Sequence, residues 1–281
     1  MALGVETSIV ERFKPVRLAA VLFLALGVMG CSSDGDELAY QERSVEEIYN
    51  KAMDELANEK YRLAAAEFDE VERQHPYSRW ARRATLMSAY ANYKVNEYDE
   101  AILAAERFIA LHPGNADAAY AHYLIALSYY EQITDVGRDQ KTTENALAAL
   151  QEVTRRFPET EYARDAMLKI DLARDHLAGK EMAIGRYYLN QRSYVAAINR
   201  FRNVIEYYQT TTHTPEALHR LTEAYLSLGI QKEAQTAAAV LGYNYPGNRW
   251  YEDSYALLGD QNLQPEQDEK SWISKAWNSV F

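Results

Sequence analysis

The sequence of 281 residues has one cysteine, Cys31, so no disulfide can form within the chain. It also lacks the phosphate-binding patterns G-x-x-x-x-G-K-[ST] and G-x-G-x-x-G, the hydrolase pattern G-x-S-x-G and the zinc-protease pattern H-E-x-x-H. The six histidines are not spaced like metal ligands; His213 and His219, for example, are six apart and fall on different faces of a helix. We therefore expect no catalytic residues, no metal ion and no cofactor.

Basic residues are fewer than acidic ones. The chain has 30 Lys and Arg against 41 Asp and Glu, which gives a net charge of −11 and a pI near 5.1. Binding of phosphate groups needs a basic surface, so nucleic acid is not an expected partner. Hydrophobic residues make up 48%, and 22 tyrosines stand against seven phenylalanines. Tyrosine buries its ring and keeps a polar edge, which suits the half-buried walls of a helical array.

The sequence does contain a pattern that recurs five times. Read from Tyr98, alanine stands at offset 3, apolar residues at 7 and 10, proline at 15 and a helix-capping residue at 17. The pattern fits again from positions 61, 143, 194 and 231, with the proline missing only in the fourth copy. Offsets 3, 7 and 10 lie on one side of a helix, and proline ends that helix. The alanines are Ala64, Ala101, Ala146, Ala197 and Ala234, and the capping residues are Ser78, Asn115, Thr160, Thr211 and Asn248.

A second amphipathic helix precedes each of these helices. Helix–turn–helix units with Ala-x-x-x-Phe and a closing proline resemble the tetratricopeptide repeat. The sequence therefore predicts an all-α fold, a right-handed superhelical solenoid of five tetratricopeptide repeats. We place the repeats at about 44–77, 78–114, 115–159, 160–210 and 211–247, followed by a closing helix that completes the folded part, 44–259. Ser44 is expected to cap the first helix, with Glu47 completing a capping box.

The third and fourth units are longer than the others. A polar loop at 134–143 enlarges the third, and it is either functional or a simple surface excursion. In the fourth, one helix runs from about Thr160 to Asn190, or two helices meet at Gly179. A single glycine costs a helix only ~1 kcal/mol, so one long helix is favoured. Such a helix would project beyond its neighbours and offer an interface.

The N-terminal segment is typical of a lipoprotein signal. Arg12, Lys14 and Arg17 precede an apolar run at 18–29 that is too short to span a bilayer as an ordinary helix. The run ends in GVMGC, which resembles a lipobox and predicts acylation of Cys31. We expect a signal peptide at 1–30 and a flexible tether at 31–43. Ser32, in place of the aspartate that commonly signals inner-membrane retention, favours an outer-membrane protein facing the periplasm.

The C-terminal segment, 260–281, is a polar linker followed by an amphipathic tail. One helical face of the tail carries Trp272, Ile273, Ala276, Trp277, Val280 and Phe281. Such a helix binds a membrane interface, binds a partner or packs back on the fifth repeat as a cap. Packing back is slightly favoured.

Four stretches carry a resemblance to one family. They are RFIALHP (107–113), YLIALSYYEQITDVGRDQ (123–140), GKEMAIGRYYL (179–189) and YQTTTHTPEALHRL (208–221). Together with the lipobox, the five repeats and the length, they resemble the BamD family, the tetratricopeptide lipoproteins of the outer-membrane β-barrel assembly (Bam) machine. The resemblance covers roughly residues 44–255, and no family pattern extends beyond residue 260.

The resemblance implies an essential non-enzymatic scaffold for folding and insertion of outer-membrane proteins. The C-terminal repeats are expected to bind the barrel-forming subunit, with accessory lipoproteins as further partners, and Asn199 and Arg200 match a family pair linked to that subunit. The same arginine could equally be a solvated helix charge. A tetratricopeptide lipoprotein of another envelope task, such as cell-wall synthesis or pilus assembly, is one alternative; an envelope enzyme with a repeat domain is a remote second.

The N-terminal repeats are expected to receive the C-terminal segments of unfolded barrel substrates. An extended segment with a terminal aromatic residue needs rings and polar edges around it. The first helices of the second and third repeats offer these in Tyr90, Tyr93, Tyr120 and Tyr123. Only some of them can face a groove, because the same positions also pack between helices.

Overall fold

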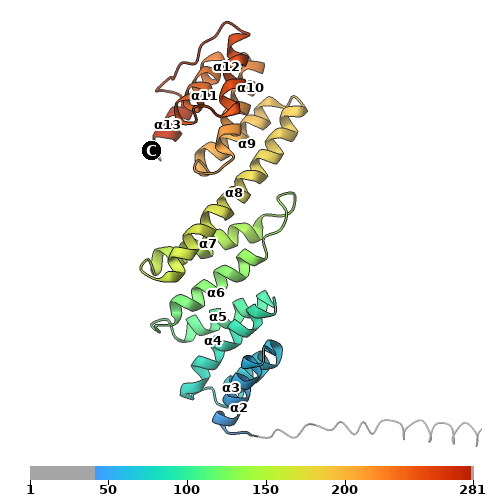
Figure 1. Ribbon diagram of the computed structural model, residues 1–281, viewed down its shortest axis with the longest axis vertical. Coiled ribbons are helices and arrows are strands. Elements are labelled where there is room, and N and C mark those ends of the chain that lie inside the picture. Colours follow the sequence, from blue (N-terminus) through green and yellow to red (C-terminus); the bar gives the residue numbers. More distant parts are fainter. Residues whose placement is uncertain (1–41, 280–281) are drawn as a thin grey trace, which may run out of the picture. The chain divides into compact units, whose positions relative to one another are not determined.

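A computed structural model describes residues 42–279, and these form helices without any β-strand (Figure 1). All the described helices belong to one compact unit, which begins at Arg43. The helices are α2 (Val45–Ala57), α3 (Tyr61–Gln74), α4 (Arg79–Lys94), α5 (Tyr98–Leu111), α6 (Ala118–Glu131), α7 (Lys141–Arg156), α8 (Glu161–Asn190), α9 (Tyr194–Tyr207), α10 (Thr214–Ser227), α11 (Gln231–Asn244), α12 (Arg249–Gly259) and α13 (Trp272–Asn278). From α2 to α11, each helix packs chiefly against the helices before and after it in the chain, as in a repeat array.

The recurring pattern marks the second helix of each pair. Four of these helices, α3, α5, α9 and α11, begin at the first residue of the pattern, and α7 begins two residues before it. The alanine at offset 3 is fully buried in all five copies, where a small side chain lets a neighbouring helix approach closely. Gly185 extends the same logic to α8, since a Cβ there would lie 2.4 Å from the Phe201 ring of α9. Small residues thus set how closely neighbouring helices approach.

Three of the five expected caps have the expected geometry. Ser78 and Thr160 accept hydrogen bonds from the backbone N–H groups of Ala81 and Ala163, and Asn248 accepts one from Trp250. Ser44 likewise accepts from Glu47 N at the start of α2. The assignments of Asn115 and Thr211 as caps are wrong.

The two misassigned residues organise turns before their helices. Asn115 accepts from Asp117 N at 2.8 Å, and α6 starts only after Asp117. Thr211 Oγ1 donates to Tyr208 O at 2.8 Å, and α10 begins at Thr214. Each helix starts two residues later than the other repeats predict, because the chain first makes an extra turn.

The turns inside the repeats share a feature that the sequence pattern does not show. Four of them end their first helix with one residue of left-handed backbone conformation. In the first, Glu59 N donates to Leu56 O at 3.0 Å and Lys60 N to Glu55 O at 2.9 Å, the two bonds of a Schellman motif. Only one of the four residues is a glycine. They are Glu59, Asn96, Arg192 and Gly229, with φ of 59°, 63°, 59° and 73°.

The long fourth-repeat helix is continuous. α8 has 30 residues, and Gly179 lies inside it without a break. A Cβ at Gly179 would lie 3.1 Å from His213 Nε2 and 3.7 Å from Val136 Cγ2, so the glycine lets two loops approach the helix. α8 contributes to two separate apolar clusters, with Ile170 in one and Met182 in the other.

The C-terminal tail packs back onto the last repeats, which is the outcome the sequence slightly favoured. Ile273 and Trp277 of α13 are buried in the apolar cluster of α9–α11. Gln209 Nε2 donates to Ala276 O at 2.7 Å, and Trp272 Nε1 to Tyr225 OH at 2.9 Å. The preceding polar linker is held along α11 by hydrogen bonds such as Gln235 Nε2 to Gln264 O, 2.7 Å. Val280 and Phe281 lie outside the described residues.

Candidate functional site

The four tyrosines chosen from sequence lie on α4 and α6, first helices of successive repeats that contact each other directly, as α6 and α8 do. All four are half-buried. α8 adds a fifth tyrosine, Tyr162, which the sequence analysis missed. Its ring centroid lies 5.5 Å from that of Tyr120 and 5.2 Å from that of Tyr123. We call this set the tyrosine cluster: Tyr90, Tyr93, Tyr120, Tyr123 and Tyr162.

Two hydroxyls of the tyrosine cluster are held by carboxylates. Tyr123 OH donates to Asp165 of α8, and Tyr93 OH donates to Glu131 Oε1 at 3.4 Å. Burial, followed by the Glu131 charge, raises the pKa of Tyr93 to about 12. Burial and the hydrogen bond to Asp165 also raise the pKa of Tyr123. These rings therefore stay neutral and present apolar faces beside fixed polar edges.

The sequence analysis missed Tyr162 and Asp165 because it chose groove residues only from the second and third repeats. A signal was present, since both residues lie in the first turns of the predicted long helix. Their partners, however, are about 40 positions away along the chain, so the pairing depends on how the repeats stack.

Arg200 and Asn199 both lie on α9, but they differ in burial and in hydrogen bonding. Arg200 is half-buried, and its Nη1 donates to Glu181 Oε1 of α8 at 3.2 Å. Asn203 Nδ2 donates to the same carboxylate at 2.9 Å. Asn199 is exposed and makes no part of this network. The arginine is therefore tied to the neighbouring helix and is not an isolated solvated charge.

A surface depression of about 500 Å³ opens beside this pair. Its lining includes Asn199, Arg200 and Arg202, together with Tyr188. A second, more apolar depression adjoins it through Asn199 and contains Val195 and Leu228. Val195 is 64% exposed, and Ile230, two residues after Leu228, is 43% exposed, so apolar side chains face solvent at the turns of both last repeats. Charged, amide and apolar groups thus meet on one surface, a combination typical of protein interfaces.

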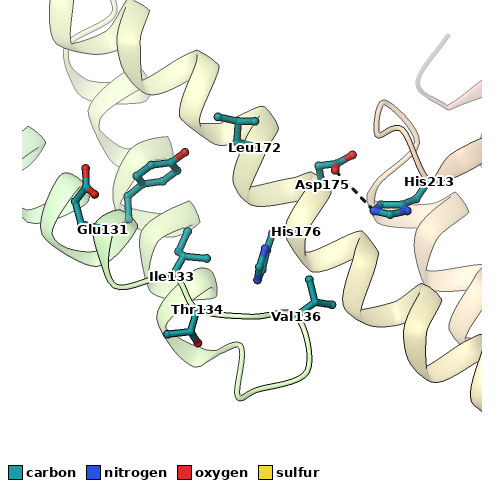
Figure 2. Close-up of a pocket in the computed structure, with 9 residues that line it drawn as sticks. Glu131, Ile133, Thr134, Val136, Leu172, Asp175, His176 and His213 are labelled. Atoms are coloured by element: carbon teal, nitrogen blue, oxygen red, sulfur yellow. Dashed lines mark ion pairs between the residues drawn. The ribbon is translucent and has the colours of Figure 1, made fainter.

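The long loop of the third repeat forms one wall of a pocket of about 540 Å³ (Figure 2). Lys180 Nζ of α8 fixes the loop by donating to Gly137 O at 3.0 Å and Arg138 O at 3.2 Å. Asp175, which also lines the pocket, accepts hydrogen bonds from Thr212 N at 2.9 Å and from Thr212 Oγ1 at 2.7 Å. Figure 2 shows His176 directed from α8 toward the loop, and its buried Nε2 has no hydrogen-bond partner. The loop is thus fastened to α8.

Two further observations bear on anchoring and ligands. Cys31, the predicted acylation site, lies outside the described residues. Between residues 42 and 279, no helix is long and apolar enough to cross a membrane. The same residues contain no group of three or more His, Cys, Asp or Glu side chains arranged to hold a metal ion.

Comparison with known proteins identifies the family. A family model described as YfiO, outer membrane lipoprotein, matches residues 41–241. An outer membrane protein assembly factor BamD of Caulobacter vibrioides is 56% identical over 252 residues, 89% of this chain and 82% of its own length. BamD of Rickettsia prowazekii is 46% identical over 86% of this chain and 96% of its own. BamD of Neisseria meningitidis serogroup A is 35% identical over 82% and 91%.

Among solved structures, a thermophilic tetratricopeptide protein of Thermus thermophilus aligns with 76% of this chain and 98% of its own at 19% identity and a TM-score of 0.36. The P58(IPK) tetratricopeptide domain aligns with 84% of this chain and 64% of its own at 14% identity and a TM-score of 0.40. The family assignment rests on the sequence matches. By these, the chain belongs to the BamD family of outer membrane protein assembly factors.

Proposed function

We propose that this protein is a non-enzymatic scaffold of outer-membrane β-barrel assembly, anchored in the outer membrane through acylated Cys31 and facing the periplasm. The observation that carries the proposal is the 56% identity to a BamD over 89% of the chain. The scaffold binds the barrel-forming subunit and accessory lipoproteins through its C-terminal repeats, and the C-terminal segments of unfolded barrel substrates through its N-terminal repeats. It works by binding alone, since the sequence carries none of the nucleotide-binding or hydrolase patterns.

The surface around Asn199 and Arg200 supports docking of the barrel-forming subunit. It has a charged group held in place by Glu181, a free amide and neighbouring exposed apolar side chains. A fixed guanidinium loses little conformational freedom on binding, so it suits a carboxylate on a partner.

Replacing Arg200 by Glu tests this docking surface. We expect the affinity for the barrel-forming subunit to fall by about tenfold or more, because one interfacial charge is reversed. Arg186→Glu is the matched control. Arg186 extends from α8 and also pairs with a half-buried carboxylate, Glu216 at 3.0 Å, with side-chain exposures of 40% and 16% against 39% and 17% for Arg200 and Glu181.

A pull-down and a titration on both variants, with circular dichroism as the folding check, give the answer. The double variant Arg200→Glu with Glu181→Arg restores the internal ion pair while leaving the partner's side mismatched. If Arg200→Glu bound the subunit with full affinity, or if Arg200→Glu and Arg186→Glu lost equal affinity, Arg200 would have only a structural role.

The tyrosine cluster supports the second part of the proposal. The hydroxyls of Tyr93 and Tyr123 donate to neighbouring carboxylates, which hold the two rings in place. The rings themselves are uncharged and present apolar faces. Substrate recognition at this surface therefore depends on rings and backbone groups more than on charge. Its affinity should change little with salt.

Titration with a barrel C-terminal peptide tests the cluster. We expect the full chain to bind this peptide on the order of tenfold more tightly than the same peptide without its final aromatic residue. Tyr90→Ala with Tyr93→Ala should remove the difference, whereas Tyr243→Ala, at an 85% exposed ring outside the cluster, should not. Equal affinity of the wild-type protein for both peptides would rule out the tyrosine cluster as the substrate site.

A further inference from the structure

The start of α4 carries an unusual concentration of positive charge. Arg79, Arg82 and Arg83 all lie within its first five residues, all are exposed, and no ion pair within residues 42–279 involves them. Tyr77, just before the helix, is fully exposed. We call this surface the arginine patch. In a chain with a net charge of −11, such a patch is a local exception.

The arrangement is unfavourable for the helix itself in two ways. Positive side chains near a helix N-terminus oppose the helix dipole, and α2, α5 and α8 all carry acidic residues in that turn. Like charges three and four positions apart also repel each other. An anionic surface against the patch reverses both effects.

A second, independent observation concerns Tyr49. This residue is only 5% exposed and packs against Trp80, with ring centroids 4.6 Å apart, and its buried hydroxyl has no hydrogen-bond partner. Arg83 lies close enough to this hydroxyl to act against the rise in its pKa caused by burial. The base of the patch thus holds an unused polar group beside a guanidinium.

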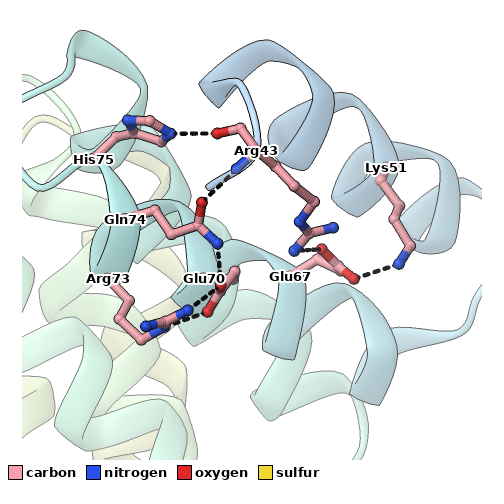
Figure 3. Close-up of polar contacts among 7 residues, drawn as sticks. All are labelled: Arg43, Lys51, Glu67, Glu70, Arg73, Gln74 and His75. Carbon is pink, nitrogen blue, oxygen red and sulfur yellow. Dashed lines mark hydrogen bonds and ion pairs between the residues drawn. The ribbon is translucent and has the colours of Figure 1, made fainter. Parts of the chain in front are cut away.

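The position of the patch in the chain indicates which anionic surface the patch would contact. Figure 3 shows Arg43, the first residue of the folded unit, fastened to the end of α3. Arg43 N donates to Gln74 Oε1 at 2.8 Å, and Arg43 O accepts from His75 Nε2 at 2.7 Å. His75 is two residues before Tyr77, so the segment that leads back to Cys31 joins the fold beside the patch. Twelve residues can span no more than about 40 Å.

We infer that the arginine patch docks on the anionic phosphate headgroups of the membrane that holds the acyl chains of Cys31. The inference rests on the proposed anchor, and it adds a second contact that sets which end of the repeat array faces the lipid. Lipid chains combined with a basic surface are a general means of stable attachment. Tyr77 and Trp80 supply the aromatic rings that prefer the headgroup layer.

The experiment uses the full mature lipoprotein in vesicles, with Tyr77→Cys as a reporter. The chain has no cysteine besides Cys31, so an acylated protein has one free thiol, at position 77. Its reaction rate with a bulky water-soluble maleimide is measured in vesicles of phosphatidylcholine and of phosphatidylcholine with phosphatidylglycerol. Tyr243→Cys, at an exposed position near the end of α11, is the matched reporter.

We expect the anionic vesicles to slow labelling at position 77 and not at position 243, and 1 M salt to abolish the protection. Arg82→Gln with Arg83→Gln should weaken the protection by roughly fivefold for each arginine removed, since each basic residue near an anionic surface contributes about that factor. Arg138→Gln with Arg164→Gln removes the same charge from exposed positions elsewhere and should leave it unchanged.

Equal labelling at position 77 in both lipids would overturn the inference while leaving the anchor in place. Loss of the protein from phosphatidylcholine vesicles would instead disprove the anchor. In that event, arginine-dependent protection by anionic vesicles still supports the patch, and its absence refutes it.

Discussion

At the residue scale, the turns between paired helices hold strain that sequence patterns do not show. Glu59 and Arg192 adopt the left-handed conformation that glycine takes in the equivalent turn at Gly229. Residues with a Cβ are disfavoured there by about 1–2 kcal/mol, and each turn is held by its two Schellman hydrogen bonds. The repeats therefore differ in the stability of equivalent turns.

The prediction is a pair of opposite changes. Arg192→Gly should raise the free energy of unfolding by ~1 kcal/mol, because the native backbone angle then carries no strain. Gly229→Ala should lower it by a similar amount, and no atom within 4 Å would meet the new Cβ, so the effect isolates the backbone. Chemical denaturation followed by circular dichroism measures both. Destabilisation by Arg192→Gly would show that its side chain matters more than the turn.

Residue periodicity predicted the buried alanines and three caps, because the apolar face of a helix and the residue that caps it can both be recognised within one short stretch of sequence. It failed at Asn115 and Thr211, where an extra turn delays the helix and the side chain bonds within the turn. It also could not reveal the bond between Tyr123 and Asp165, which joins two repeats.

At the element scale, α13 behaves as a cap on the last repeats. Its apolar face is used inside the molecule, with Ile273 and Trp277 buried and Arg202 stacked 4.7 Å from the Trp272 ring. The sequence showed that face clearly. It did not determine which surface the face packs against, because a membrane, a partner and the fifth repeat all offer apolar surface.

Trp277→Ala tests whether α13 packs on the last repeats. We expect it to lower the free energy of unfolding by ~3–5 kcal/mol, since a large side chain is removed from a packed cluster. It should also open the linker at 260–271 to proteolysis, because the linker's hydrogen bonds to α11 depend on the docked helix. Tyr243→Ala, at an exposed ring on α11, serves as the control. An unchanged melting temperature for Trp277→Ala would mean that α13 is free to bind elsewhere.

At the scale of the whole molecule, the recurring sequence pattern predicted the helical-repeat architecture. The family resemblance predicted the role in outer membrane protein assembly. The candidate sites were predicted less completely. The five recurring units identify the pairs of helices, yet pockets and ring clusters arise where different repeats meet. The pocket beside His176 needs the third-repeat loop, the middle of α8 and His213 together. Those residues are more than 30 positions apart, so no local pattern joins them.

The length of α8 has a consequence for how the protein unfolds. Its first half belongs to an apolar cluster with α6 and α7, and its second half to the large cluster of the last repeats. Arrays of short repeats lose cooperativity, since each unit touches only its neighbours. A single helix shared by two clusters couples their stabilities, because melting one end exposes backbone hydrogen bonds of the other. We therefore expect the C-terminal repeats to unfold together with the third, as one block.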